Sequence, residues 1–215
     1  MTTSPPDDPP PSPARRRRER ERAAARTAIL SAARDLGRRD GWEAVTMRRL
    51  AGEIEYSANF AYRYFGGRDD ILLALVRDGF ARLREQMALA GAQPVSPAKG
   101  TASNAAEAAV RRAGHGYLDF ALTEPELYQL MYSLGGVRVQ AADTWDEGQA
   151  VGDLLAGLLA AAGDRQPARH VLQLWATAHG LIALRVVGRV DADPAALHAL
   201  LDDTLTDCLV RALRP

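Results

Sequence analysis

The chain has 215 residues, of which 47% are hydrophobic and 25% are charged, and its formal net charge is zero. This length suits one large domain or a small domain joined to a medium one, either of which can bury a core. The single cysteine, Cys208, excludes an internal disulfide and a thiolate cage for zinc, and it indicates a reducing compartment. Because the longest weakly polar stretch, residues 151–163, is shorter than a membrane crossing, we expect a cytoplasmic protein without a membrane partner.

The zero net charge hides an uneven distribution along the chain. Residues 15–70 carry fourteen Arg against nine Asp and Glu, a net charge of +5, whereas residues 71–215 sum to −3. A positive N-terminal quarter on a mildly acidic body suggests that only the N-terminal part meets a polyanion.

Helix-forming residues dominate the composition and period-two alternation is scarce, so the sequence predicts an all-α fold. Residues 1–13 are rich in Pro, Ser, Thr and Asp, and we expect this tail to be disordered. Helical periodicity predicts a first helix over about residues 20–38, which ends at the turn Asp40-Gly41.

Two short helices are predicted next. Thr46 is an N-cap candidate for a helix over residues 47–53, and Ser57 is one for a helix over residues 57–63. This spacing is typical of a helix-turn-helix, in which the first helix braces the second across the major groove of DNA.

A long helix and a bundle complete the predicted architecture. The long helix covers about residues 69–90, with apolar residues at steps of three and four, and a Gly-, Pro- and Ser-rich connection follows. Further helices are predicted over about residues 104–122, 125–134, 144–162, 167–187 and 194–213.

A family resemblance is carried by residues 26–72, which read RTAILSAARDLGRRDGWEAVTMRRLAGEIEYSANFAYRYFGGRDDIL. This segment resembles the DNA-binding domain of the tetracycline-repressor (TetR) family, with Ala51 in the second helix, Tyr62 in the third, and a cation three residues after Phe65. One departure is the turn, where the family commonly has Gly-Val-Ser and this chain has Glu55-Tyr56-Ser57.

A second resemblance lies in YLDFALTEPELYQLMY and LWATAHGLIALR. These segments are similar to the C-terminal domain of a subset of the family, called the WHG type after residues that are Trp175, His179 and Gly180 here. The resemblance implies a homodimer, a pseudopalindromic operator in double-stranded DNA, and a ligand pocket in the C-terminal bundle. It suggests three regions, which are a disordered tail (1–13), a helix-turn-helix domain with a basic arm (14–68), and a helical ligand-binding and dimerisation domain (69–215).

Candidate phosphate contacts come from both short helices and the residue after them. Thr46 is either a purely structural N-cap or also a phosphate contact, and Arg48 is either a phosphate contact or a solvated charge. Tyr62 is either a core aromatic residue whose hydroxyl reaches solvent or, as the resemblance favours, a phosphate contact. Arg68 opposes the macrodipole of the long helix, so we expect it to anchor a phosphate.

Base reading is expected from the exposed face of the third helix. Asn pairs with adenine, Arg with guanine, and an apolar side chain can meet a thymine methyl group. Phe60 could equally belong to the core, and the Arg run at residues 15–18 is either a DNA-contacting arm or a solvated helix extension. The candidate residues on the third helix are Ser57, Ala58, Asn59, Phe60 and Arg63.

The candidate effector pocket is a set of aromatic, His and Met side chains in the predicted bundle. Such residues are most often ordinary core, but as a group they suggest an apolar or aromatic ligand. We expect no cofactor and no metal site, because the four histidines lack the paired spacing of metal ligands. The candidates are His115, Tyr117, Phe120, Tyr128, Met131, Trp145, Trp175 and His179.

The sequence thus favours a dimeric DNA-binding regulator, with repression as the family's usual mode. The apolar stripes at residues 171–187 and 197–209 either wrap one core or form the dimer interface, which we favour. Two alternatives remain, which are a helical binding module without DNA recognition and a helical enzyme. No nucleophile elbow, phosphate-binding loop or acid-base pair supports the enzyme.

Overall fold

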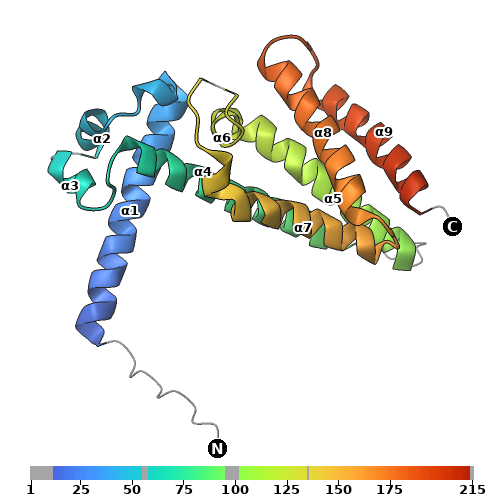
Figure 1. Ribbon diagram of the computed structural model, residues 1–215, viewed down its shortest axis with the longest axis horizontal. Helices are drawn as coiled ribbons and strands as arrows, with labels where there is room; N and C mark the ends of the chain where they lie inside the picture. The colour runs from blue at the N-terminus through green and yellow to red at the C-terminus, as the bar shows by residue number, and fades with distance from the viewer. Residues whose placement is uncertain (1–11, 55–57, 95–101, 135, 214–215) are drawn as a thin grey trace, which may run out of the picture. The chain divides into compact units, whose positions relative to one another are not determined.

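The computed structural model describes residues 12–54, 58–94, 102–134 and 136–213. Within these ranges every regular element is helical, which confirms the predicted all-α class. The chain forms two compact units, and the boundary between them falls between Ile71 and Leu72. Figure 1 labels the helices of both units.

The N-terminal unit packs three helices around a small apolar core. Ile29 and Leu36 of the first helix, Leu50 of the second and Ala61 of the third are completely buried. Arg26 closes one edge, since its guanidinium lies 4.2 Å from the ring centre of Phe65. The elements of this unit are α1 (Pro13–Asp40), the 3-10 turn η1 (Trp42–Ala44), α2 (Met47–Glu53), α3 (Ala58–Tyr62) and the start of α4 (Arg68–Ala92).

Helix α1 begins earlier than its apolar periodicity predicts. Ser12 caps it by accepting a hydrogen bond from the backbone N–H of Arg15, and Pro13 occupies the first position. An ion pair between Arg15 and Glu19, one turn apart, supports the same end. The first turns were missed because their side chains are exposed and carry no apolar stripe. Most of the tail that we expected to be disordered, residues 1–11, lies outside the described residues.

The end of α1 is shaped by contact between a glycine and a tryptophan. A Cβ atom at Gly37 would lie 2.4 Å from two ring carbons of Trp42, so the indole rests directly on the glycine backbone. Gly41 then reverses the chain with a φ of +81°, a conformation that favours glycine. These two glycines bring η1 back against α1 and set the position from which α2 starts.

The C-terminal unit is a helical bundle in which α5 packs against α6, α7, α8 and α9. Helix α4 approaches α5 closely at Gly116, where a Cβ atom would lie 3.3 Å from the main chain at Gln86 and Met87. No helix in the described ranges is long and apolar enough to cross a membrane. After α4, the elements are α5 (Ala102–Thr123), α6 (Pro125–Met131), η2 (Ala141–Thr144), α7 (Trp145–Ala161), α8 (Pro167–Val186) and α9 (Pro194–Ala212).

Candidate DNA-binding surface and ligand cavity

The two short helices of the N-terminal unit have the arrangement of a helix-turn-helix, with α2 packed against α3. Thr46 is the N-cap of α2, as the sequence predicts: its hydroxyl accepts a hydrogen bond of 3.2 Å from the backbone N–H of Arg49. The predicted cap of the next helix, Ser57, and the unusual turn residues Glu55 and Tyr56 lie outside the described residues.

Most candidate DNA contacts present polar side chains to solvent. Tyr62 is 54% exposed although it belongs to a helix whose Ala61 is fully buried. Phe60 is half-buried and packs on Tyr64 with ring centres 5.0 Å apart, and Ala58 begins α3. The surface therefore offers hydroxyl, amide and guanidinium groups, the types that contact phosphates and base edges. The exposed candidates are Thr46, Arg48, Asn59, Tyr62 and Arg63.

Arg68 has a role within the fold that the sequence did not reveal. Its Nε donates a hydrogen bond of 2.9 Å to the carbonyl of Val45, and its Nη2 donates one of 3.1 Å to the carbonyl of Trp42. The side chain thus ties the start of α4 to the segment that enters α2. These two hydrogen bonds explain why a cation occupies the first turn of α4, and the explanation does not require DNA. If Arg68 also binds a phosphate, its guanidinium must bind the phosphate and the two carbonyls together.

Replacing Arg68 with Met is expected to lower the free energy of unfolding of the N-terminal unit by about 1.5–3 kcal/mol, because two carbonyls lose a charged donor. Urea denaturation followed by circular dichroism measures the change. Arg63→Met, at an exposed position in the same unit, should change stability by only about 0.5 kcal/mol. Equal stability of the two variants would contradict the bracing role.

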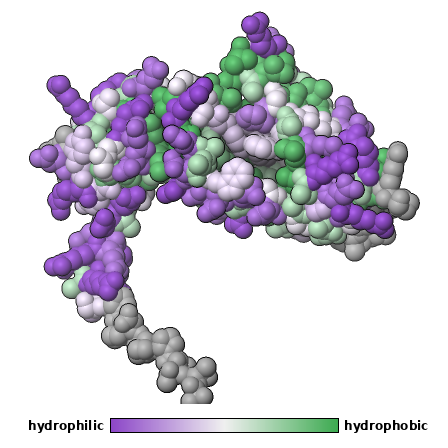
Figure 2. Space-filling view, viewed as in Figure 1, coloured by the Kyte–Doolittle hydropathy of each residue, from purple (hydrophilic) through white to green (hydrophobic). Residues whose placement is uncertain are grey.

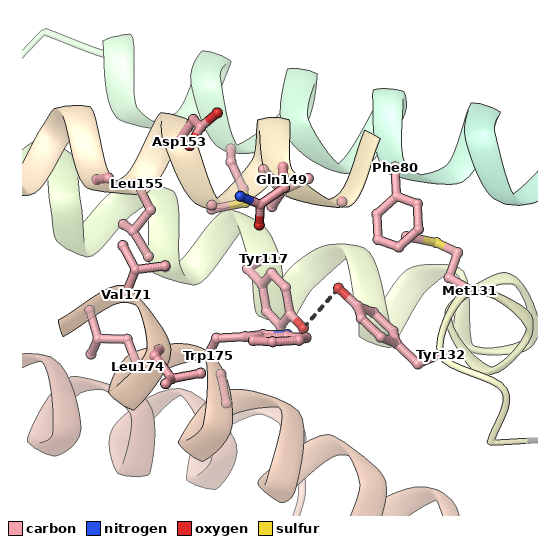
Figure 3. Close-up of a pocket in the computed structure, with 18 of the residues that line it drawn as sticks. Phe80, Tyr117, Met131, Tyr132, Gln149, Asp153, Leu155, Val171, Leu174 and Trp175 are labelled. Atoms are coloured by element: carbon pink, nitrogen blue, oxygen red, sulfur yellow. Dashed lines mark hydrogen bonds between the residues drawn. The ribbon is translucent and has the colours of Figure 1, made fainter. Parts of the chain in front are cut away.

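The C-terminal unit contains a cavity of about 470 Å³, a size typical of small-molecule sites. Its wall is mainly apolar and comes from α7, α8 and the segment that joins α6 to α7, with contributions from α4, α5, α6 and α9. Figure 3 shows Tyr117 and Tyr132 pointing toward each other beside Trp175. Four of the predicted pocket residues line the cavity, namely Tyr117, Met131, Trp145 and Trp175.

Two further candidates lie directly behind the wall. The hydroxyl groups of Tyr117 and Tyr128 are 2.8 Å apart, and that of Tyr128 is 2.7 Å from Nδ1 of His179. Burial raises the pKa of both tyrosines well above the ordinary value and lowers the pKa of His179. At neutral pH this polar chain is therefore uncharged.

His115 and Phe120 do not line the cavity, which corrects their assignment to it. The ring of His115 joins α5 to α9, with Nδ1 2.6 Å from Nδ1 of His198 and Nε2 2.9 Å from a carboxylate oxygen of Asp202. Phe120 is 1% exposed and belongs to the core of the bundle. Their residue types suited a pocket, but their helix faces point elsewhere.

Several lining residues were not predicted. Tyr132 follows the predicted pocket residue Tyr128 by four positions. This spacing places both side chains on one helix face, so it could have indicated Tyr132 as a pocket residue. Gly148 and Gly152 of α7 also line the cavity, and glycines four apart on one helix face leave room where side chains would otherwise fill the bundle. Phe80 of α4 has ordinary apolar spacing, so nothing in its sequence context separates it from core.

Comparison with known proteins identifies the family. The family model for bacterial regulatory proteins of the tetR family matches residues 29–75, and that for a tetracyclin repressor-like C-terminal domain matches residues 110–208. Together the two matches span more than half of the chain. The chain belongs to the TetR family of transcriptional regulators. This TetR-family protein is therefore a DNA-binding regulator and not an enzyme.

Solved structures share the fold of this TetR-family regulator over most of its length. A protein of unknown function from Rhodococcus sp. RHA1 is 26% identical, with a TM-score of 0.72 over 88% of this chain and 96% of that chain. A TetR-like transcriptional regulator from the same organism is 21% identical, with a TM-score of 0.62 over 87% and 97%. No curated protein matches the sequence.

Proposed function

We propose that this TetR-family regulator is a ligand-responsive repressor that binds a pseudopalindromic operator as a homodimer. The observation that carries the proposal is the set of exposed polar side chains on α2 and α3, which a buried core holds in place. Stability of the unit does not require an exposed phenol at Tyr62 or an exposed amide at Asn59. DNA as the partner accounts for both, and it would place the protein in the cytoplasm.

The exposed groups divide into base contacts and phosphate contacts. Asn59 of α3 and Arg63, which directly follows α3, read base edges, because amide and guanidinium groups form paired hydrogen bonds with adenine and guanine. Thr46, Arg48 and Tyr62 contact phosphates and fix the register of α3 in the groove. The arginine-rich start of α1 adds a sequence-independent attraction, since residues 13–26 carry seven Arg against two Glu.

The apolar surface of the last two helices supports the proposed homodimer. Leu184 and Val187 near the end of α8, and Leu200 and Val210 of α9, are each at least 45% exposed. Figure 2 shows hydrophobic surface around the turn that joins α8 and α9. An isologous contact between two such faces would bury these side chains and give the twofold symmetry that a palindromic operator requires.

The cavity in the C-terminal unit is the proposed effector site. Its mainly apolar wall suits an apolar or aromatic compound, as the sequence suggests. Such a compound can release the operator only if it binds the DNA-free geometry of the dimer more tightly than the DNA-bound geometry. Helix α4 begins in the DNA-binding unit and continues in the effector unit, so it is the element through which the two sites are linked.

Selection of binding sites from random duplex DNA tests DNA recognition. The wild-type protein is expected to enrich an inverted repeat, with affinity that falls steeply as salt is raised. Tyr62→Phe removes two hydroxyl contacts per dimer, each worth about 1 kcal/mol, and should lower affinity roughly 30-fold for every site. Asn59→Ala should instead relax the preference at one position in each half-site.

Both substitutions lie at exposed positions, so unchanged thermal unfolding serves as the control for folding. Failure to enrich any sequence at low salt would overturn the proposed DNA recognition. Enrichment of a single half-site without a repeat would support DNA recognition but would contradict binding as a dimer.

A further inference from the structure

A chain of four polar side chains ends at the cavity wall. It runs from His179 through Tyr128 and Tyr117 to Tyr132, with contacts of 2.7, 2.8 and 3.4 Å. Tyr117 and Tyr132 line the cavity, whereas the other two lie behind it. Figure 3 shows the contact between the two lining tyrosines as a dashed line.

One assignment of the hydrogens satisfies all three contacts. In it Tyr117 donates to Tyr132, Tyr128 donates to Tyr117, and Nδ1–H of His179 donates to Tyr128. Burial raises the pKa of Tyr132, and hydrogen bonds from Tyr117 and from the indole of Trp175 oppose that rise. In this assignment the Tyr132 oxygen accepts the hydrogen bond of Tyr117, and no acceptor for its own hydrogen is found among the described residues.

The cavity wall also excludes most charged ligands. None of its lining residues in the described ranges is Lys, Arg or His, and Asp153 is the one lining carboxylate, exposed to solvent. Moving an ionised carboxylate or phosphate from water into such a wall is costly without a cationic partner. A ligand without formal charge avoids this cost.

Size and shape agree with a compact ring-containing molecule. The cavity is bounded by aromatic and branched side chains, and the two glycines of α7 widen it. A polar ligand atom placed at Tyr132 would leave the rest of the molecule against Met131, Val171 and Leu174.

We infer that the cavity binds an uncharged, largely apolar ligand that presents a hydrogen-bond acceptor, such as a ketone or quinone carbonyl, to the hydroxyl of Tyr132. The inference rests on the proposed function in that it takes this cavity as the effector site. Tyr132 donates to the carbonyl, and the chain behind it holds the hydroxyl in that orientation. Trp175 of α8 lies beside Tyr132 in the cavity wall, with the two ring centres 6.2 Å apart, and offers an apolar face to the rest of the ligand.

Three matched probes test the inference by calorimetric titration of the full chain. Benzophenone has a carbonyl, diphenylmethane has the same two rings without an acceptor, and 4-benzoylbenzoate adds a negative charge. We expect benzophenone to bind about tenfold more tightly than diphenylmethane, since one buried donor gains a partner. We expect 4-benzoylbenzoate to bind at least tenfold more weakly than benzophenone.

Tyr132→Phe is the deciding variant. It should reduce benzophenone binding to the level of diphenylmethane and leave diphenylmethane binding unchanged, which also shows that the cavity is intact. Irradiation attaches benzophenone to neighbouring C–H groups, and mass spectrometry should locate it on cavity residues such as Met131.

Equal binding of the two neutral probes by the wild-type protein, or a carbonyl preference that survives in Tyr132→Phe, would overturn the role of Tyr132. Tight binding of the carboxylate would overturn the neutrality of the ligand, and binding of no probe would overturn the ligand class. These titrations contain no DNA, so their failure is distinguishable from a failure of the operator selection.

Discussion

Substituting Ala for Gly37 is expected to destabilise the DNA-binding unit by about 3 kcal/mol, because the new methyl group overlaps the buried indole ring of Trp42. The Cβ atom would lie 2.4 Å from Cε3 and Cζ3 of Trp42, and the indole is only 6% exposed. Domains of this kind are stable by only about 5–15 kcal/mol, so the loss is a large fraction of the whole. Urea denaturation followed by circular dichroism measures it.

Gly52→Ala is the matched control for this prediction. Gly52 also lies within a helix of the N-terminal unit, but nothing lies within 4 Å of its Cβ position. The same substitution should therefore stabilise the unit by about 0.5–1 kcal/mol through helix propensity. Opposite signs at the two glycines are the expected result, and a stabilising effect at Gly37 would show that Trp42 can rearrange.

A charge on the exposed apolar face of α8 is expected to separate the proposed dimer. Leu184→Glu would bury one unpaired carboxylate per subunit in the interface, at a cost of about 3–5 kcal/mol. The dimer dissociation constant should then rise about 100-fold or more, and binding to an inverted repeat should weaken with it. Analytical ultracentrifugation measures the first effect, and titration of the selected operator measures the second.

Leu89→Glu provides the control, because Leu89 of α4 is 65% exposed and receives the same substitution in the same unit. It should leave the oligomeric state unchanged. A monomeric Leu89→Glu variant, or a fully dimeric Leu184→Glu variant, would place the interface outside the end of α8.

The local signals in the sequence predicted the DNA-binding unit well. Thr46 caps α2 through its own hydroxyl, so the identity and position of this residue were sufficient to predict where α2 begins. Apolar spacing found Ile29 and Leu36, because a helix that packs on a core must carry a buried stripe. The early start of α1 at Pro13 escaped this reasoning, since an exposed helix has no such stripe and depends on its cap and ion pairs.

Roles that depend on distant partners could not be predicted. Arg68 contacts carbonyls 23 and 26 residues away, and no local pattern reports an accepting carbonyl. His115 meets a histidine 83 residues further on, at a contact set by how α9 lies on α5. Which aromatic side chains line a cavity and which fill the core depends on small rotations of packed helices. Phe120, a predicted pocket residue, therefore lies in the core, whereas Tyr132, which was not predicted, lines the cavity.

The exposed start of α1 has a consequence for the length of that helix. Its side chains from residue 12 to residue 24 make no buried contact, and a helix of that length is only marginally stable alone in water. Its arginines also crowd the positive end of the helix dipole, so these turns open at little free-energy cost. A polyanion that neutralises these arginines removes their repulsion from the helix dipole and favours the helical form of this segment. If the polyanion is DNA, as proposed, the winding of α1 and the length of DNA that the protein contacts form one equilibrium, set by the charge that the arginines meet.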